Sequence, residues 1–449
     1  MLRSREMPET VIELASRLES AIEARTAKVG VIGLGYVGLP LVLEFHRAGF
    51  PVVGFDIDQR KVDSIRAGSS YIAHIDAGRI RAAVKGGRLE ATSDFSRLSE
   101  ADAILICVPT PLTPQREPDL SYIESTADSI AAVVRPGQLV VLESTTYPGT
   151  TEEVVQPRLE AGGMRVERDI FLAFSPERED PGNPDHSTRS IPKVVGGVGP
   201  ASGRLAEGLY QGALDRVVRV SSARVAEAVK ILENTYRAVN IALVNELKVT
   251  FDAMGIDVWE VIEAARTKPF GFAPFYPGPG LGGHCIPIDP FYLTWKAREY
   301  GLSTRFIELA GEVNTGMPGY VVRRLTAALN EAGKPLRGTR VLVLGAAYKK
   351  NIADVRESPA LEIIEMLQEA GARVDYHDPH IPFLPKMRRH QIELSSVALD
   401  GLAQYDAAIV VTDHASVDYQ AVAAAVPLIV DTRNVYGGRP PSRARVVKA

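Results

Sequence analysis

The chain has 449 residues, of which 45% are hydrophobic and 24% charged, and a formal net charge of −4. A chain of this length exceeds what one hydrophobic core supports, so we expect two to four domains. The small net charge argues against nucleic-acid binding, and no window approaches the roughly 18 consecutive apolar residues that a transmembrane helix needs. Two cysteines and no N-terminal apolar stretch after basic residues favour a reducing, cytoplasmic location over secretion.

Residues 8–27 carry the spacing of an amphipathic helix, with Val11, Leu14, Leu18 and Ile22 on one stripe. The other face mixes Glu with Arg and is not basic, which argues against a membrane anchor. We expect this helix to dock on a larger body as an N-terminal extension, residues 1–27.

A βαβ unit follows, with a strand from Lys28, a glycine-rich turn, a helix to Arg47 and a second strand, Val52–Phe55, that ends at Asp56. The turn matches the G-x-G-x-x-G pattern of dinucleotide-binding domains, in which glycines allow a tight turn, close approach of the pyrophosphate and helix packing. The cofactor contacts expected here are Gly33, Gly35, Tyr36, Val37, Gly38 and Asp56.

The acid at the second strand's end indicates which dinucleotide binds. Asp56 should accept hydrogen bonds from the ribose hydroxyls and repel a 2′-phosphate, which favours NAD over NADP. Arg60 is a counterargument, since it could meet a phosphate. Its position one turn into the next helix favours contact with the adenine or with solvent.

Polar residues follow the next strands, expected at Ala103–Val108, Gln138–Leu142 and Ile170–Phe174. Ligands bind at the carboxyl ends of strands in doubly wound sheets, although turn and helix-cap chemistry is the alternative explanation. The cofactor or active-site candidates are Thr110, Glu143, Ser144 and Thr145, and after the third strand Glu177 and Arg178. Cys107, by contrast, lies in an apolar run and is explained as a buried strand residue.

Residues Ala223–Met254 contain no Gly or Pro, which predicts one long helix that serves as a domain spine or dimer contact. Glu227, Lys230 and Asn234 share one face of it. A Glu–Lys pair at this spacing is usually a solvent-exposed ion pair. The Ala, Val and Ile residues around Lys230 favour instead a place in a functional site.

The second cysteine, Cys285, follows a loop rich in glycine and proline, residues 275–283. The ordinary explanation is a small buried hydrophobe. The loop has neither helical nor strand periodicity, however, and backbone-shaping loops are typical of ligand sites. A thiolate beside a hydride acceptor can add to an aldehyde, and the adduct can lose a second hydride to give a thioester that water cleaves.

The last third repeats the α/β pattern without the glycine fingerprint. Strands are expected at Arg340–Gly345, Arg373–Tyr376, Ala407–Thr412 and Leu428–Asp431, with a basic loop over residues 346–356 and a helix starting at Ser358-Pro359. The fold class predicted is therefore α/β, with two Rossmann-like doubly wound domains joined by a long central helix and a helical domain. The expected limits are 28–205 for the dinucleotide-binding domain, 206–330 for the central domain and 331–449 for the C-terminal domain, with the substrate site in a cleft between domains.

Six motifs in one order resemble those of the UDP-glucose/GDP-mannose dehydrogenase family, from about Lys28 to the end of the second Rossmann-like unit. They are Gly-Leu-Gly-Tyr-Val-Gly, Glu-Ser-Thr, Ser-Pro-Glu, Glu-x-x-Lys-x-x-x-Asn, Gly-Gly-x-Cys and Tyr-Lys-x-x-x-x-Asp-x-Arg. The loops 175–183 and 268–289 are similar to those of the bacterial UDP-N-acetylglucosamine 6-dehydrogenases, with UDP-N-acetylmannosamine dehydrogenases as the nearest alternative.

The resemblance implies catalysis by Cys285 as nucleophile, Lys230 as oxyanion stabiliser and Asn234 as its partner, with Glu177 and Asp289 managing water and protons and Thr145 beside them. It further implies cofactor contact by Arg356 and a UDP-sugar site formed by Arg178, Phe275, Tyr276, Gly280, Gly282, Tyr348 and Lys349. Ile288 departs from the lysine of many UDP-glucose members, which leaves any base there to Asp289.

The function that follows is NAD-dependent, four-electron oxidation of a UDP-sugar's C6 alcohol to the uronic acid for surface polysaccharide, by a homodimer or higher homo-oligomer formed through the central helix. A two-electron alcohol dehydrogenase that leaves Cys285 idle is one alternative, and NADH stoichiometry separates the two. A nucleotide-sugar or NAD sensor is another, although a sensor needs none of the catalytic set. We expect no metal, because two scattered cysteines and eight dispersed histidines supply no zinc cluster.

Overall fold

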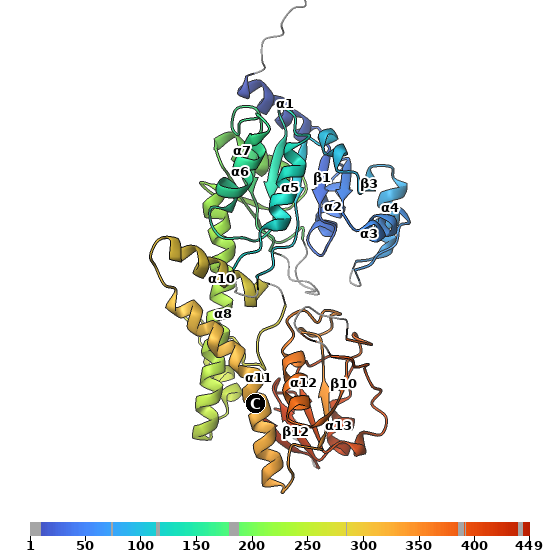
Figure 1. Cartoon of the computed structure of the whole chain (residues 1–449), viewed down its shortest axis with the longest axis vertical. Coiled ribbons are helices and arrows are strands. Elements are labelled where there is room, and N and C mark those ends of the chain that lie inside the picture. Colours follow the sequence, from blue (N-terminus) through green and yellow to red (C-terminus); the bar gives the residue numbers. More distant parts are fainter. Residues whose placement is uncertain are drawn as a thin grey trace, which may run out of the picture. The chain divides into compact units, whose positions relative to one another are not determined.

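The computed structural model describes residues 10–72, 75–113, 117–178, 188–283, 285–384, 390, 392–438 and 443–449. The chain divides into two compact units, Met1–Glu233 with Trp295–Tyr300, and Asn234–Thr294 with Gly301–Ala449. Each unit is built on its own sheet (Figure 1). No helix in the described part of the chain is long and apolar enough to cross a membrane.

The first unit contains an eight-stranded sheet in the order β3-β2-β1-β4-β5-β6-β7-β8, with only the β6–β7 pair antiparallel. Its first six strands have the order of a dinucleotide-binding fold. The strands are β1 (Val29–Ile32), β2 (Val52–Phe55), β3 (Leu89–Thr92), β4 (Ala103–Ile106), β5 (Leu139–Leu142), β6 (Phe171–Phe174), β7 (Lys193–Gly197) and β8 (Val217–Arg219).

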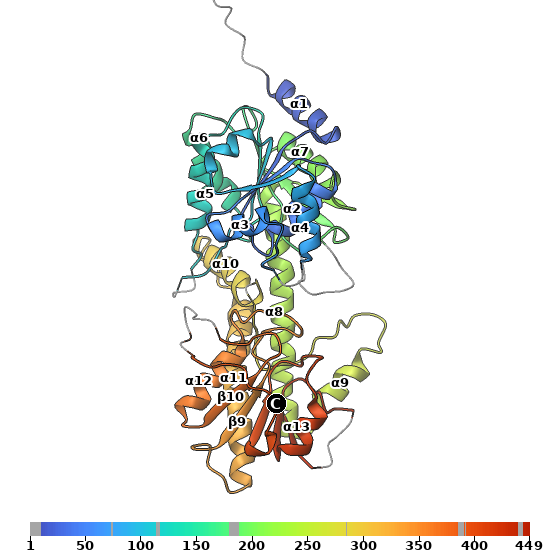
Figure 2. The ribbon, with the colours of Figure 1, turned by 90° about the vertical axis from the view of Figure 1, so that its right-hand side faces the viewer.

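Helices cover both faces of this sheet, because its central strands are apolar on both sides (Figure 2). One face packs against α5 and α6, and the other against α2 and α7. The helices of the unit are α1 (Val11–Glu23), α2 (Gly38–Arg47), α3 (Gln59–Arg66), α4 (Ala77–Lys85), η1 (Phe95–Glu100), α5 (Ser121–Ala131), η2 (Thr151–Val155), α6 (Gln156–Ala161) and α7 (Pro200–Gln211).

The predicted N-terminal helix is confirmed as α1. Thr10 and Glu13 form a capping box, in which the Thr10 hydroxyl accepts from the Glu13 amide and the Glu13 carboxylate accepts from the Thr10 amide. Leu14, Leu18 and Ile22 are buried and belong to the same apolar cluster as α7.

Two details of the first unit differ from expectation. The strand expected to reach Val108 ends at Ile106, so Cys107 lies just beyond the ladder and is only partly buried. The region expected to be helical from Ala206 contains β8, and the boundary expected after residue 205 falls inside α7. The first sheet therefore continues further along the chain than that boundary.

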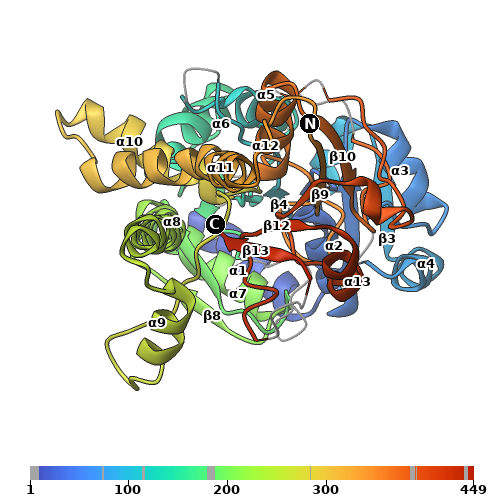
Figure 3. The same ribbon diagram turned by 90° about the horizontal axis from the view of Figure 1, so that it is seen from below.

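The second unit contains a five-stranded parallel sheet in the order β10-β9-β11-β12-β13. Helices α11 and α12 pack on one face and α13 on the other (Figure 3). The strands are β9 (Arg340–Leu344), β10 (Arg373–His377), β11 (Ala407–Val410), β12 (Leu428–Asp431) and β13 (Arg445–Lys448), and the helices are α9 (Val258–Ala265), α11 (Arg305–Glu331), α12 (Pro359–Glu369), η3 (Leu402–Gln404) and α13 (Tyr419–Ala425).

Two helices contribute residues to both units. The predicted long helix is confirmed as α8 (Ala223–Met254), and α10 runs from Cys285 to Glu299. The sequence predicted only a loop around Cys285, whereas the loop ends at that residue. Pro290 lies inside α10, and the prolines at 287 and 290 hid the helix from a reading based on helix propensity. The α/β fold class with two doubly wound sheets is thus confirmed.

Candidate active site

The glycine turn after β1 leaves room for a ligand at one defined position. Gly33 has φ +92°, and a Cβ there would lie 2.3 Å from the carbonyl oxygen of Cys107. A Cβ on Gly38 would lie 1.9 Å from the Gly33 oxygen. A Cβ on Gly35, by contrast, would meet nothing within 4 Å. The turn is packed at its two ends and open in its middle, before the N-terminus of α2, which fits a dinucleotide pyrophosphate.

Asp56 fixes this turn from the end of β2. One carboxylate oxygen accepts from the Leu34 amide at 2.8 Å and pairs with Lys61 at 3.0 Å. Arg60 pairs instead with Asp58 and its side chain is 91% exposed. Ile57, which the sequence analysis did not single out, is 81% exposed and offers an apolar surface beside the acid. An apolar residue directly after the strand's terminal acid was the signal for it.

Some of the polar residues after β4 and β5 are buried or hydrogen-bonded within the unit, and others are accessible. Ser144 donates to the Val108 carbonyl at 2.7 Å, which ties the two strand ends together, and Thr110 is buried. Thr146 is also buried, whereas Thr145, just past the carboxyl end of β5, is partly exposed. Thr145 is thus the most accessible side chain of the segment 143–146.

Glu143 differs from the expected cofactor contact. It is fully buried, and its two carboxylate oxygens bind Lys193, at 2.5 Å, and the Tyr210 hydroxyl. Burial and then the Glu143 charge raise the pKa of Tyr210 well above its usual value, so the phenol stays protonated and donates. Glu143 holds β7 and α7 to the end of β5. Lys193 could have been noticed as a charged residue opening the apolar run Val-Val-Gly-Gly.

The segment after β6 is attached to one face of α8. Lys230 is buried and donates to the backbone carbonyl of Glu177. Arg178 pairs with Glu233 at 2.5 Å and donates to the Pro192 carbonyl at 2.6 Å. Arg178, expected to bind substrate, therefore anchors this segment, while the Glu177 carboxylate does not take part in the Lys230 bond.

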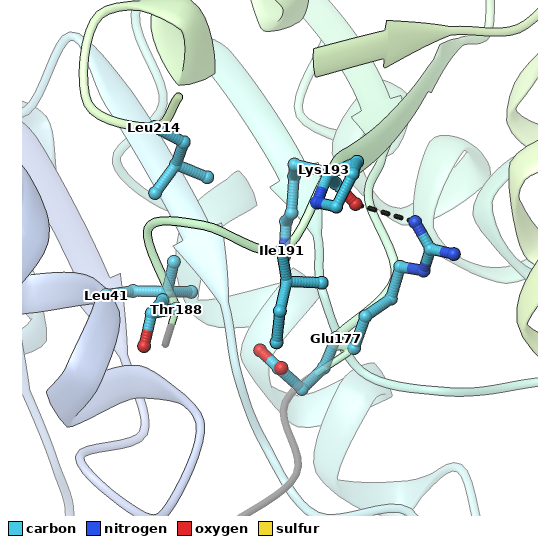
Figure 4. A pocket seen from close by; sticks show the side chains of 8 residues that line it. Leu41, Glu177, Thr188, Ile191, Lys193 and Leu214 are labelled. Carbon is cyan, nitrogen blue, oxygen red and sulfur yellow. Dashed lines mark hydrogen bonds between the residues drawn. The ribbon is translucent and has the colours of Figure 1, made fainter. Parts of the chain in front are cut away.

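Glu177 and Lys193 line a small cavity together with Leu41, Ile191 and Leu214 (Figure 4). Its volume is about 10 Å³, close to what one water molecule requires. Arg178 and Thr188 also line the cavity, so polar and apolar residues share its wall, and the polar ones can hold and orient such a water.

Glu227, one turn before Lys230 on α8, holds the loop that follows Thr145. Its carboxylate accepts from the amides of Gly149, at 2.5 Å, and Thr151, at 2.9 Å, and from the Thr151 hydroxyl at 2.7 Å. Burial nevertheless raises the pKa of Glu227 to about 7. The acid nearest to Lys230 on this helix face, Glu227, is thus occupied by bonds to the loop.

In the second unit, Asn234, expected to be the partner of Lys230, bonds to Asp289, while Lys230 bonds to the Glu177 carbonyl. The Asn234 amide donates to Asp289 Oδ2 at 2.5 Å, and both side chains are buried. Asp289 is in the first turns of α10, four residues after Cys285. The Cys285 side chain and His284 lie outside the described residues.

The glycine loop packs directly on Tyr348. A Cβ on Gly282 would lie 2.5 Å from Tyr348 Cβ, and Gly283, with φ +81°, would carry a Cβ 2.9 Å from its ring. The Gly283 amide donates to the Arg356 carbonyl at 2.9 Å. Gly280 has φ +133°. Glycine is required at these positions because the loop backbone lies close to neighbouring residues, as the number of glycines in the sequence suggested.

The aromatic residues that open the loop pack on α8 and α9. Phe275 lies 5.6 Å, centroid to centroid, from Tyr236, and Tyr276 stacks on Trp259 at the same separation. The Tyr276 hydroxyl donates to Glu263 at 2.7 Å. Both expected substrate contacts thus have a structural partner within the unit.

Two further residues of the second unit, Asn245 and Arg433, lie beside the glycine loop and were not predicted from the sequence. Asn245 accepts from the Gly278 amide at 2.9 Å and donates to Asn314, so a buried amide pair holds the loop. Arg433, two residues after the end of β12, donates from Nε to the Val411 carbonyl, and a Cβ on Gly278 would lie 2.8 Å from its Nη1. Burial lowers the pKa of Arg433. An arginine at a strand's carboxyl end was the available signal.

The basic loop after β9 contributes charge beside the glycine loop. Lys350 pairs with Asp413 at 3.1 Å, and Arg356 pairs with Asp354 at 2.7 Å and is half exposed. Lys349 precedes them on the same loop. Within the described residues, no group of three or more His, Cys, Asp or Glu side chains could hold a metal ion.

A dinucleotide turn with an acid after the second strand, and a second open sheet beside a glycine loop, define the class of an NAD-dependent dehydrogenase with a separate nucleotide-binding unit. Family models agree, matching the NAD-binding domain over residues 27–214, the central domain over 224–316 and the UDP-binding domain over 342–438. The chain belongs to the UDP-glucose/GDP-mannose dehydrogenase family, and NAD is its cofactor.

Individual relatives differ in their sugar. The chain is 39% identical to the UDP-N-acetyl-D-glucosamine 6-dehydrogenase of Pseudomonas aeruginosa over 86% of this chain and 90% of that one. It is 35% identical to the UDP-N-acetyl-D-mannosamine dehydrogenase of Pyrococcus horikoshii over 91% and 96%. The solved UDP-D-ManNAc dehydrogenase structure from Pyrococcus horikoshii has a TM-score of 0.84 at 33% identity and covers 94% of this chain and 98% of that one. The protein is therefore a UDP-sugar dehydrogenase.

Proposed function

We propose that the protein oxidises the C6 hydroxymethyl group of UDP-N-acetylglucosamine to the carboxylate, in two successive two-electron steps, for surface polysaccharide synthesis. The observation that carries the proposal is the Asn234–Asp289 hydrogen bond, which fixes the start of the helix on which Cys285 stands. Lys230, four residues before Asn234, is the cation on the same helix face. Nucleophilic catalysis on an aldehyde needs a nucleophile and a group that stabilises the oxyanion, and we assign these roles to Cys285 and Lys230.

NAD, when bound, supplies the hydride acceptor for both oxidations. Cys285 is the nucleophile that adds as a thiolate to the C6 aldehyde. The thiohemiacetal oxygen is then stabilised by the Lys230 ammonium group.

Hydrolysis of the thioester requires a water molecule and an acceptor for its proton. Glu177 lines the water-sized cavity, and its carboxylate supplies the base. Water adds to the thioester carbonyl carbon, the C–S bond breaks, and the sulfur leaves as the thiolate. We also assign Thr145, which is accessible at the end of β5, to the catalytic residues.

The UDP moiety is held by the second unit. We assign Tyr348, Lys349 and the loop Phe275–Gly283 to this site, and add Arg433 as a cation for the diphosphate because its guanidinium group borders Gly278. Arg356 is assigned to the cofactor, and Arg178 to holding the segment beside Glu177.

The choice of sugar rests on the loops 175–183 and 268–289 and on the 39% identity to the UDP-N-acetyl-D-glucosamine 6-dehydrogenase. A pocket shaped for an acetamide leaves polar groups unpaired when the sugar carries a C2 hydroxyl, so UDP-glucose should be disfavoured about a hundredfold. The manno epimer is the second candidate, because relatives named for it match at 33–35% identity. Measuring kcat/KM for UDP-N-acetylglucosamine, its galacto and manno epimers and UDP-glucose tests the assignment, and a preference for any other sugar overturns it.

A homodimer through α8 is part of the proposal. Leu232, Tyr236 and Leu243 are 69%, 51% and 52% exposed and recur along one helix at spacings of four and seven residues. A Leu232→Glu variant should sediment as a smaller species than wild type, and Ile12→Glu, an equally exposed site on α1, should not. Unchanged sedimentation of the Leu232 variant would contradict the dimer contact.

A further inference from the structure

His414 is a fully buried histidine just after β11, and its two ring nitrogens have different partners. Nε2 lies 2.9 Å from Asp378 Oδ2, and Nδ1 lies 3.0 Å from the backbone nitrogen of Asn351. A backbone N–H can only donate, so Nδ1 accepts and the ring proton is on Nε2, where it donates to Asp378. The two partners together require one neutral tautomer.

Asn351 lies in the middle of the basic loop after β9 and has φ +60°, in the left-handed region. Its own side-chain oxygen accepts from the Ala415 amide at 2.9 Å. The neighbouring Lys350 pairs with Asp413 at 3.1 Å. Residues 413–415 therefore hold the loop at two adjacent positions, and the His414 bond fixes the backbone at the strained one.

Asp378, at the end of β10, gives the histidine a rigid base. The oxygen that accepts from His414 also accepts from the amides of Ala346, at 2.7 Å, and Ala347, at 2.8 Å, where the same loop begins. Burial acts to raise the pKa of Asp378, but these bonds outweigh it and hold the pKa below its usual value. One carboxylate thus orients both the histidine and the first residues of the loop.

This network occupies the point of the second sheet where ligands are expected. Strand β9 lies between β10 and β11 in the sheet. The connection from β9 runs to β10 on one side, and the connection from β10 then runs to β11 on the other side. The strand order therefore reverses between β9 and β11. Open α/β sheets bind ligands at that point, outside the carboxyl ends of the strands. The His414–Asn351 bond crosses it from the β11 side to the β9 side.

We propose that His414 is a positioning residue for the UDP moiety, because it sets the backbone of the loop that carries Tyr348 and Lys349. The inference rests on the proposed function, in which those two residues hold the UDP moiety. The loop is ordered by His414 before the ligand arrives, so part of the ordering cost of binding is met in the free protein.

Two variants of His414 test the hydrogen bonds of its two ring nitrogens separately. In His414→Asn the side-chain oxygen stands near the position of Nδ1 and can still accept from the Asn351 amide. In His414→Gln the side-chain amide reaches the position of Nε2 and can donate to Asp378, but nothing accepts from Asn351. His390→Gln, at a histidine that pairs with Glu365, is the matched control.

The measurements are Kd for UDP and for NAD by calorimetry on the full-length protein, and kcat and KM for the UDP-sugar. His414→Gln should raise Kd for UDP and KM about tenfold, the effect of losing one partly buried hydrogen bond that fixes the loop backbone, with kcat within about threefold of wild type. His414→Asn should stay within about threefold for every quantity, and the Kd for NAD should not change in any variant.

Three outcomes would overturn the inference: His414→Gln binding UDP as wild type does, His414→Asn losing as much UDP affinity as His414→Gln, or a loss of NAD affinity equal to the loss of UDP affinity. Failure of wild type to bind UDP is a different result, because it overturns the proposed substrate class as well. Binding of UDP by wild type with unchanged affinity in His414→Gln overturns the positioning role alone.

Discussion

The side-chain amide of Asn234 lies 2.5 Å from the Asp289 carboxylate, so α8 is bonded to the first turns of α10 at a buried point. Cys285 begins α10, and Lys230 lies one turn before Asn234 on α8. The bond therefore links the two helices that carry the proposed nucleophile and the proposed oxyanion stabiliser.

Asn234→Ala should lower kcat by about ten- to a hundredfold, because removing one partner of a buried hydrogen bond costs about 1–3 kcal/mol and releases the start of α10. The Kd for NAD should not change. Asn240→Ala, which removes an exposed amide bonded to a backbone carbonyl of the same helix, is the control and should retain full activity. Retention of kcat in Asn234→Ala would contradict the role.

Glu177→Gln should accumulate the covalent thioester, because the step that needs a base comes after both oxidations. The contact with Lys230 is made by the Glu177 backbone carbonyl and survives the change. Intact-mass spectrometry after incubation with substrate and NAD should show the adduct, and Glu124→Gln, a surface acid paired with Arg158, should show none. Only unmodified protein in the Glu177 variant would count against this assignment.

Asp56→Asn should raise the ratio of NADP to NAD use by about tenfold or more, because it removes a charge that repels the 2′-phosphate while leaving an oxygen for the Leu34 amide. Asp58→Asn is a matched control, since Asp58 pairs with the exposed Arg60. The ratio of kcat/KM for the two cofactors measures the effect. Equal use of both cofactors by wild type would refute the argument.

Glu227 should make stability depend on pH. A carboxyl whose pKa is raised to about 7 in the folded protein contributes stability fully below its unfolded value of 4.5, and that contribution is lost as the pH rises through about 7. From pH 5 to pH 8 wild type should lose up to roughly 3 kcal/mol at this site.

Urea unfolding of wild type and Glu227→Gln checks this dependence. Glutamine carries no charge, so its cost relative to wild type should shrink as the pH rises, whereas the cost of Glu124→Gln should stay constant. A gap between wild type and Glu227→Gln that is independent of pH, or that widens, would show that Glu227 is ionised throughout.

Much of the fold was predictable because its signals are local. The glycine turn with Asp56, the uninterrupted run of α8 and the Ser358-Pro359 helix start each appear in a few consecutive residues, and the structure has them where expected. Short edge strands such as β3 and β8 were missed, because three or four residues with one or two apolar positions give no period of their own. The helix start at Cys285 was missed because its prolines suggest a loop.

Residues of the candidate site were predictable where the residue type has one chemical use. They were less predictable where contacts with distant residues decide the role of the side chain. Glu143 follows a strand just as Thr145 does, and only the positions of Lys193 and Tyr210 make it a buried structural acid. In the sequence, His414 belongs to none of the motifs that indicated a site. Its role depends on Asp378 and Asn351, which are 36 and 63 residues away.

The most direct test of the account is the number of NADH molecules formed for each molecule of UDP-N-acetylglucosamine consumed, measured by absorbance and by chromatography of the sugar nucleotide. We predict two NADH and one uronic acid for wild type. Cys285→Ala should form no uronic acid, with the Kd for NAD unchanged because the glycine turn is in the other unit. One NADH per sugar with an aldehyde or ketone product, or normal uronic acid formation by Cys285→Ala, would contradict the account.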